Sequence, residues 1–188
     1  MPRLENWHLS ASLLRGIAVV LLCLALPFGA GAANPSEPAA IAALRADQSR
    51  TAAQLQAEAA RLRTSTQDPK FRAWATLAEA EFANDQEHAE GALTGIDQAI
   101  AQADALNLPD LRFEALLRLS TILVNRGQSK ETEAVLAKMQ AMVEASNNPR
   151  WRALWLHERG VLERKLGHFE DARTLFLQAR TLSRDIGD

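Results

Sequence analysis

Apolar and small residues recur along this chain with a period of forty residues. When Pro69, Pro109 and Pro149 are aligned, the three segments that follow them match without a gap. The columns that stay apolar or small are Phe82, Ile122 and Leu162, then Ile96, Leu136 and Phe176, then Ala99, Met139 and Ala179. A fixed period of this length is typical of a repeat array, in which each unit packs against its sequence neighbours.

Each repeat begins with the start signal of a helix. Proline is well placed at the first helical position, because its missing N–H would have no intrahelical partner there. Asp68 and Asn148 precede two of the prolines and can accept N-cap hydrogen bonds, whereas Leu108 cannot. We therefore expect a first helix in each repeat, running from its proline to about Asn84, Asn125 or Leu166.

The stop signals are in register as well. Gly127 and Gly167 supply a tight turn after the first helix, and Glu87 stands in that column of the first repeat. A second helix is expected to end at about Leu106, Ser146 and Ile186. The next column holds Asn107, Asn147 and Gly187, residue types that adopt the left-handed conformation that ends a helix. The segments 69–108, 109–148 and 149–188 therefore each predict helix, turn and helix.

One amphipathic helix is predicted before the first repeat. The apolar residues of this segment fall at spacings close to whole helical turns and form one narrow stripe, consisting of Ile41, Leu44, Leu55, Ala59 and Leu62. We expect a helix from about Ala39 to Thr64, within a capping element at residues 39–68 that is polar toward solvent. A coiled-coil dimer helix is the alternative, because the spacing also fits a loose heptad. Residues 33–38, with two prolines, predict an extended linker.

The first 32 residues have the parts of a secretory signal peptide. Arg3 and Arg15 flank a polar lead, the stretch from Ile17 to Phe28 is almost purely apolar, and Ala30-Gly31-Ala32 is a small-x-small site. The apolar stretch is shorter than the roughly 20 residues that cross a bilayer as a helix. We expect cleavage after Ala32 and a periplasmic or secreted protein without a membrane span; an uncleaved anchor is the alternative. The cut also removes Cys23, the only cysteine.

Composition and candidate chemistry narrow the function classes. The chain has 9 Gly, 7 Pro and no Tyr, which favours helices, and its formal charge of −2 gives no reason to expect a nucleic-acid partner. His8 lies in the signal segment, His88 and His168 share a column after the turn, and His157 stands alone on its helix. Nothing matches a metal, phosphate-loop or nucleophile motif. We predict no enzymatic activity, cofactor or metal, and structural or solvated roles for His88, His157 and His168.

The third repeat resembles the tetratricopeptide repeat. The resemblance rests on Gly160, Ala172 and Ala179 and on the phrase Leu166-Gly167-His168-Phe169-Glu170-Asp171-Ala172. The same columns hold Ala80, Ala92 and Ala99 in the first repeat and Ser120, Thr132 and Met139 in the second. The resemblance covers residues 69–188. It implies helical hairpins in which small residues let the two helices approach closely, with Phe176 filling the gap to the next repeat. The period of forty, against about 34 for the family, implies longer second helices; HEAT-type hairpins are the alternative.

The predicted fold is therefore all-α, an α-α superhelix of about three such hairpins preceded by one N-terminal helix. The resemblance implies a concave groove, lined by the first helices, that binds a protein or peptide segment. The candidate groove residues are Trp74, Glu81, Glu114, Arg118, Thr121, Asn125, His157, Glu158, Arg164 and Lys165. A merely solvated groove is the alternative. The residues with which some family members clamp a terminal carboxylate are not in matching columns, so that specificity is not implied.

The last repeat has two further features. Arg159 and Glu163 are four residues apart and are expected to pair on an exposed face. The last helix is apolar on more than one side, so we expect another element to pack against it. This neighbour is expected to be further repeats, another domain, or a partner subunit, which can be a second copy of the chain. The apolar residues concerned are Leu175, Phe176, Leu177, Leu182 and Ile186.

Residues 182–188 resemble the junction between long tetratricopeptide repeats in bacterial signalling proteins. In those proteins an exported repeat domain often precedes a membrane helix and a diguanylate cyclase or histidine kinase. Two functions therefore follow from the resemblance: a non-enzymatic, exported interaction module, or the N-terminal sensor region of a membrane-bound signalling enzyme. A marginally stable fragment without a function of its own is a third alternative.

Overall fold

The computed structural model describes residues 34, 36–83 and 89–187. This part of the chain is helical and contains no strand, which confirms the predicted all-α class. The helices are α2 (Ala39–Ala46), α3 (Ala52–Ser65), α4 (Pro69–Phe82), α5 (Ala89–Ala105), α6 (Pro109–Asn125), α7 (Ser129–Ser146), α8 (Pro149–Lys165) and α9 (Phe169–Asp185). Among the residues described, no helix is both long enough and apolar enough to cross a membrane.

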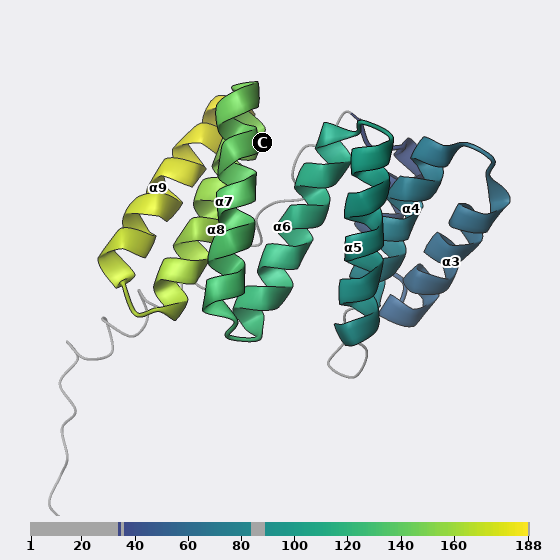
Figure 1. The fold of residues 1–188 in the computed structure, drawn as a ribbon, viewed down its shortest axis with the longest axis horizontal. Helices are drawn as coiled ribbons and strands as arrows, with labels where there is room; N and C mark the ends of the chain where they lie inside the picture. The colour runs from purple at the N-terminus through teal and green to yellow at the C-terminus, as the bar shows by residue number, and fades with distance from the viewer. Residues whose placement is uncertain (1–33, 35, 84–88, 188) are drawn as a thin grey trace, which may run out of the picture. The chain divides into compact units, whose positions relative to one another are not determined.

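The helices pack in chain order, each against the next, as Figure 1 shows from α3 to α9. The pairs α4–α5, α6–α7 and α8–α9 are the three predicted hairpins. The first helices of successive hairpins also touch one another, α2 with α4, α4 with α6, and α6 with α8. These four helices therefore form one layer, and the candidate residues lie on three of them, α4, α6 and α8.

The local signals place the helix ends as predicted. Asp68 accepts a hydrogen bond from the Lys70 N–H at the start of α4, and Asn148 accepts from Arg150 and Trp151 at the start of α8. Leu108 provides no side-chain cap, as expected of an apolar residue. The turn and stop columns have positive φ angles, 72° at Gly127, 86° at Gly167, 51° at Asn107 and Asn147, and 75° at Gly187. The Glu87 column of the first repeat lies outside the described residues.

The segment before the first repeat differs from the single helix predicted for it. It forms two helices, α2 and α3, because Thr51 and Gln54 form a capping box that starts α3 at Ala52. Asp47, which accepts from the Ser49 backbone N–H 2.9 Å away, lies in the intervening turn. Asp47 is forty residues before Glu87, so the repeat period extends into this segment. Residues 39–65 are therefore a shortened hairpin rather than one capping helix.

The predicted small-residue columns lie where two helices cross. Ala80, Ala92, Ala99, Ser120, Thr132 and Met139 are all buried. At Gly95 of α5, an added Cβ would lie 2.6 Å from the Ala80 Cβ of α4, so the hairpin needs a glycine there. In the third hairpin the Phe176 ring lies against Gly160, where an added Cβ would be 2.8 Å from the ring. Phe176 thus packs against the first helix of its own hairpin.

The three tryptophans of the repeats pack against neighbouring helices. Trp74 and Trp151 are buried, and the Trp151 ring stacks on Phe113 with centroids 4.7 Å apart. Trp155 is half-buried, and its indole N–H donates to the Leu136 carbonyl oxygen 3.0 Å away. These contacts join α8 to the preceding hairpin. The predicted signal peptide, with His8 and Cys23, and the residue His88 lie outside the part that the structure describes.

Candidate functional site

Charged side chains run across the first helices in one chain of ion pairs. Arg45 on α2 lies 2.9 Å from Glu81 on α4, through Nε and Oε2. The other oxygen of Glu81 lies 3.2 Å from the Nε of Arg118 on α6. Arg118 Nη2 is 3.9 Å from Glu114, and Glu114 Oε1 accepts from Arg150 Nη1 on α8 at 2.9 Å. We call the surface formed by Arg45, Glu81, Glu114, Arg118 and Arg150 the ionic face.

Helical spacing explains why these groups meet. Glu114, Arg118 and Thr121 are at positions i, i+4 and i+7 of α6, so they lie on one side of that helix. Because the hairpins repeat every forty residues, the side of α6 that carries them faces the same way as Glu81 on α4 and Glu158 on α8. The packing of α4 against α6 and of α6 against α8 then brings these charges into contact.

Glu114 is the most enclosed charge of the ionic face. Its side chain is 3% exposed. Burial acts to raise its pKa, but the guanidinium groups of Arg118, Arg150 and Arg45 together outweigh burial and lower the pKa. Glu114 is therefore ionised at neutral pH and binds α6 to α8. Removing one of its partners would leave a buried charge unpaired, which is the costly case for such groups.

The predicted linker packs against the helices. The Asn34 carbonyl oxygen accepts from the Glu37 N–H 2.9 Å away, so Asn34 and Glu37 lie close together instead of in the extended form expected. Asn34 is 4% exposed, and Ser36 donates a hydrogen bond to the Asp110 carboxylate at the start of α6. The Glu37 carboxylate is 5% exposed and contacts Arg45 Nη1 at 2.5 Å. Burial raises the pKa of Glu37 despite this Arg45 contact.

The α8 end of the same layer holds three of the candidate residues. Thr121 donates to Glu158 Oε2 across 3.3 Å, which joins α6 to α8. The Nδ1 of His157 lies 3.5 Å from Glu158 Oε1, and the His157 ring lies 5.4 Å from the Phe176 ring. His157 is about one third exposed, whereas Glu158 is buried. This end is therefore a polar contact between hairpins with one accessible imidazole.

The remaining candidates lie apart from these contacts. Trp74 is 2% exposed and contributes only its ring face, which lies 6.0 Å from the Arg45 guanidinium. Asn125, Arg164 and Lys165 lie in the last turns of α6 and α8 and belong to none of the ion pairs described above. The structure thus brings six of the ten candidates together: Glu81, Glu114, Arg118, Thr121, His157 and Glu158.

Sequence reasoning missed three members of the site, Glu37, Arg45 and Arg150. Arg45 stands in the repeat column of Asn125 and Lys165, which take no part in these ion pairs, so the column does not place it on the ionic face. Glu37 and Arg150 carried no repeat signal either, because their contacts depend on how the segment before α2 and the start of α8 pack on the layer.

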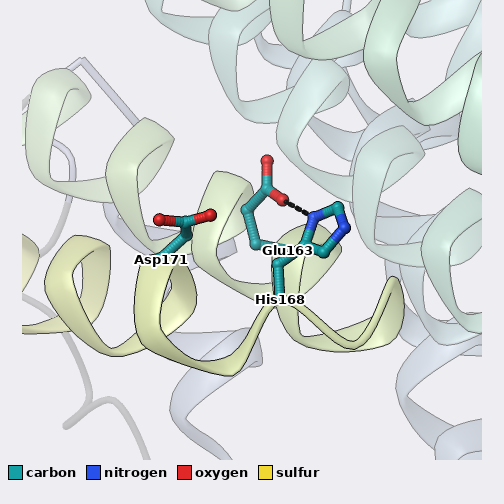
Figure 2. Close-up of side chains that lie close together, drawn as sticks. All are labelled: Glu163, His168 and Asp171. Carbon is teal, nitrogen blue, oxygen red and sulfur yellow. Dashed lines mark hydrogen bonds and ion pairs between the residues drawn. The ribbon is translucent and has the colours of Figure 1, made fainter.

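A second cluster, formed by Glu163, His168 and Asp171, joins α8 to α9 (Figure 2). One oxygen of Glu163 lies 2.7 Å from His168 Nδ1, and the other lies 2.7 Å from Arg159 Nη2. Potential ligand atoms of the three residues lie within 4.8 Å of one another, a spacing that a metal ion could bridge. Both Glu163 oxygens are already engaged, however, and Asp171 is exposed. We therefore interpret the cluster as a structural contact that stabilises the turn between the two helices.

The Arg159–Glu163 pair differs from its prediction in one respect. The two side chains do pair, but Glu163 is only 8% exposed, so the pair is not on an exposed face. The other carboxylate oxygen contacts His168, in the turn after α8. The His168 hydrogen bond and Arg159 lower the pKa of Glu163, with the His168 bond the larger cause.

Two hollows lie away from the ionic face. One, of about 660 Å³, is lined by α3, α4 and α5, including Gln56, Thr76 and Gly95. The other, of about 520 Å³, is lined by α7, α8 and Leu182 of α9, including Arg152 and Trp155. Neither contains a member of the ionic face. No family model, no curated protein and no solved structure matches the chain.

Proposed function

We propose that the chain is an exported interaction module of the tetratricopeptide type, non-enzymatic by itself, that binds a protein or peptide segment over its ionic face. The observation that carries the proposal is the ion-pair chain across α2, α4, α6 and α8, which places guanidinium and carboxylate groups on one layer. Glu81 and Arg118 are 24% and 32% exposed, so a partner can reach both signs of charge. Such mixed polar groups fix the orientation of a bound segment.

Export is the second part of the proposal. It is supported by the signal-like sequence of the first 32 residues, and by the lack of cysteine in residues 33–188, whose repeats therefore contain no thiol that an oxidising compartment could cross-link. Mass spectrometry of protein recovered from a cell fraction outside the cytoplasmic membrane tests it. We expect a mature N-terminus at Ala33, and full-length protein retained inside the cell would contradict export.

The binding proposal is tested by selecting peptides from a random library on the purified chain. Each selected peptide is then measured against two matched variants, Arg118→Lys on the ionic face and Arg61→Lys on α3. Both substitutions keep the charge and remove the planar fork of arginine, and Arg61 pairs with Glu58 on an exposed surface. We expect peptides whose affinity falls about tenfold with Arg118→Lys and is unchanged with Arg61→Lys.

Two results would contradict the binding proposal. One is a library that yields no binder at all. The other is a set of binders whose affinity is the same for both variants, since those peptides would contact another surface. A circular dichroism melt of each variant shows that the fold is retained before binding is compared.

A further inference from the structure

The ionic face already holds a segment of its own chain. Residues 34–37 precede the first described helix, and their Glu37 carboxylate lies on Arg45, a member of the ionic face. Glu37 also lies close enough to Glu81, Glu114 and Arg118 for their charges to affect it. The described polar contacts of this segment include the Ser36–Asp110 hydrogen bond and the hydrogen bond from the Glu37 N–H to the Asn34 carbonyl oxygen. It therefore contacts the surface in the way a short acidic peptide would.

Glu37 contacts only one of the three guanidinium nitrogens of Arg45. One oxygen of Glu37 meets Nη1, and Glu81 lies beside Nε. The third nitrogen, Nη2, is buried without a hydrogen-bond acceptor among the described residues. A guanidinium binds a carboxylate best through two parallel hydrogen bonds. A carboxylate that approached both Nη1 and Nη2 would supply the missing acceptor, so Glu37 is an incomplete ligand for Arg45.

The position of Glu37 is also costly for a charged group. Its side chain is almost fully enclosed, and burial outweighs Arg45 so that its pKa is raised. The ionised carboxylate thus gains little by leaving water for this site. If Glu37 leaves, it recovers its hydration, while Arg45 keeps Glu81 and Glu114 keeps Arg118 and Arg150. The exchange of one carboxylate for another at Arg45 therefore disturbs none of the other ion pairs.

We propose that Arg45 and its neighbours on the ionic face form a carboxylate-binding site for an acidic segment of a partner protein, and that Glu37, with Ser36 beside it, occupies this site as an internal competitor. The inference rests on the proposed binding function and specifies its ligand class. The partner's Asp or Glu carboxylate takes the place of Glu37 on Arg45 and bridges Nη1 and Nη2. The displaced Ser36 and Glu37 move away from Asp110.

The test uses the full chain and a synthetic, fluorescently labelled peptide with the sequence of residues 33–40, together with the same peptide in which its glutamate is replaced by glutamine. Anisotropy titrations compare the wild-type chain with Glu37→Gln, which keeps the shape of the side chain and removes the internal carboxylate. Glu58→Gln is the matched control, because Glu58 pairs with an arginine, Arg61, away from the ionic face. We expect the acidic peptide to bind Glu37→Gln about tenfold more tightly than wild type or Glu58→Gln.

A second variant keeps the test decisive if Glu37→Gln does not fold. Ser36→Ala removes the hydrogen bond to Asp110 without changing any charge, and it should also raise the affinity for the acidic peptide. The glutamine peptide should bind all four chains weakly and equally. Equal binding of the acidic peptide to Glu37→Gln, Ser36→Ala and wild type would overturn the inference.

The outcome separates this inference from the proposed function. If library peptides still depend on Arg118 while the acidic peptide ignores the Glu37 substitution, the binding function stands and the internal competitor is wrong. If neither set of peptides depends on the ionic face, both fail. A wild-type dimer that the acidic peptide splits into monomers would also overturn it, because the site would then bind the segment of a second copy.

Discussion

Glu163 makes two strong contacts at the turn between α8 and α9. Its carboxylate accepts from His168 Nδ1 and pairs with Arg159, each at 2.7 Å, and it is 8% exposed. The His168 N–H also donates to the Glu163 backbone carbonyl 2.9 Å away. Hydrogen bonds to a charged group typically contribute about 1.5–3 kcal/mol when the group is shielded from water. Glu163 therefore links the end of α8 to His168, the residue that precedes α9.

Replacing Glu163 with glutamine should lower the free energy of unfolding by about 2 kcal/mol at neutral pH. The lowered pKa of Glu163 sets the pH dependence. Because the folded pKa lies below the ordinary value of 4.5, the stabilisation is complete above about pH 4.5 and is lost as pH falls through the folded pKa. Urea unfolding of wild type and Glu163→Gln should be measured between pH 7 and pH 3. The difference between their free energies of unfolding, called the gap below, should shrink as the pH falls.

His168→Gln serves as the control for this pH effect. It removes the larger cause of the lowered pKa while leaving Arg159 in place, so its gap to wild type should also shrink at low pH. A gap for Glu163→Gln that stays constant down to pH 3 would show that the carboxylate acts through packing alone.

At the scale of single helices, short sequence signals account for most of the boundaries. Proline, Asp or Asn at the start and Gly or Asn at the stop each act within a few residues, so they could be predicted without knowing the fold. The break between α2 and α3 was signalled in the same way by Thr51 and Gln54, but the long apolar stripe through Ile41 and Leu55 concealed it. Both helices bury that stripe, which is why periodicity alone could not separate them.

Thr51→Ala should destabilise the chain by about 1 kcal/mol, because it removes the side-chain oxygen that accepts from the Gln54 N–H. Its effect should be confined to the N-terminal hairpin. Hydrogen exchange measures this directly: amides in the first turn of α3 should exchange faster, while those of α8 should not change. Unaltered exchange in α3 would mean that packing of Leu55 and Ala59 on α4 positions that helix without the cap.

Two glycines of α5 offer a matched test of how closely the first hairpin packs. At Gly91 an added Cβ would meet no atom within 4 Å, so Gly91→Ala should stabilise the chain by about 0.5–1 kcal/mol through helix propensity. At Gly95 the same Cβ would lie 2.6 Å from Ala80 Cβ, so α4 and α5 have to separate. Overpacking of this kind costs about 1–3 kcal/mol, which exceeds the propensity gain.

Thermal melts of the two glycine variants should therefore shift in opposite directions, upward for Gly91→Ala and downward for Gly95→Ala. If both variants were more stable than wild type, the close approach of α4 and α5 would not be a requirement of the hairpin.

At the scale of the whole molecule, the sequence could predict a layer of first helices and six residues that meet on it. The forty-residue period is a one-dimensional pattern, and it fixes which helix faces are equivalent. Which charges pair across those faces depends on distances between different hairpins, and the approach of residues 34–37 to Arg45 depends on a turn outside the repeats. Such contacts have no periodic signal, which is why Glu37 and Arg150 appear only in the structure.

The last helix keeps the apolar surface expected of it. Leu177 is 52% exposed and Ile186 is 38% exposed, while Leu175 and Leu182 are half-buried. Forty residues earlier, in α7, Val135 and Met142 stand at the positions of Leu175 and Leu182 and are buried and half-buried, whereas Ala137, at the position of Leu177, is exposed. We expect α9 to associate with the α9 of a second copy, because burying a leucine side chain typically contributes about 1.5–3 kcal/mol.

Light scattering over a range of concentrations should show an apparent mass that rises with concentration for wild type and rises less for Leu177→Gln. Since Leu177 is exposed in one chain, its substitution should change the melting temperature little at low concentration. Gln178→Asn, at the neighbouring exposed position, is the control and should associate like wild type. A wild-type mass that stays at one chain over the whole range would contradict self-association through α9. The exposed leucine would then be an ordinary surface residue, since single apolar side chains are common on soluble proteins.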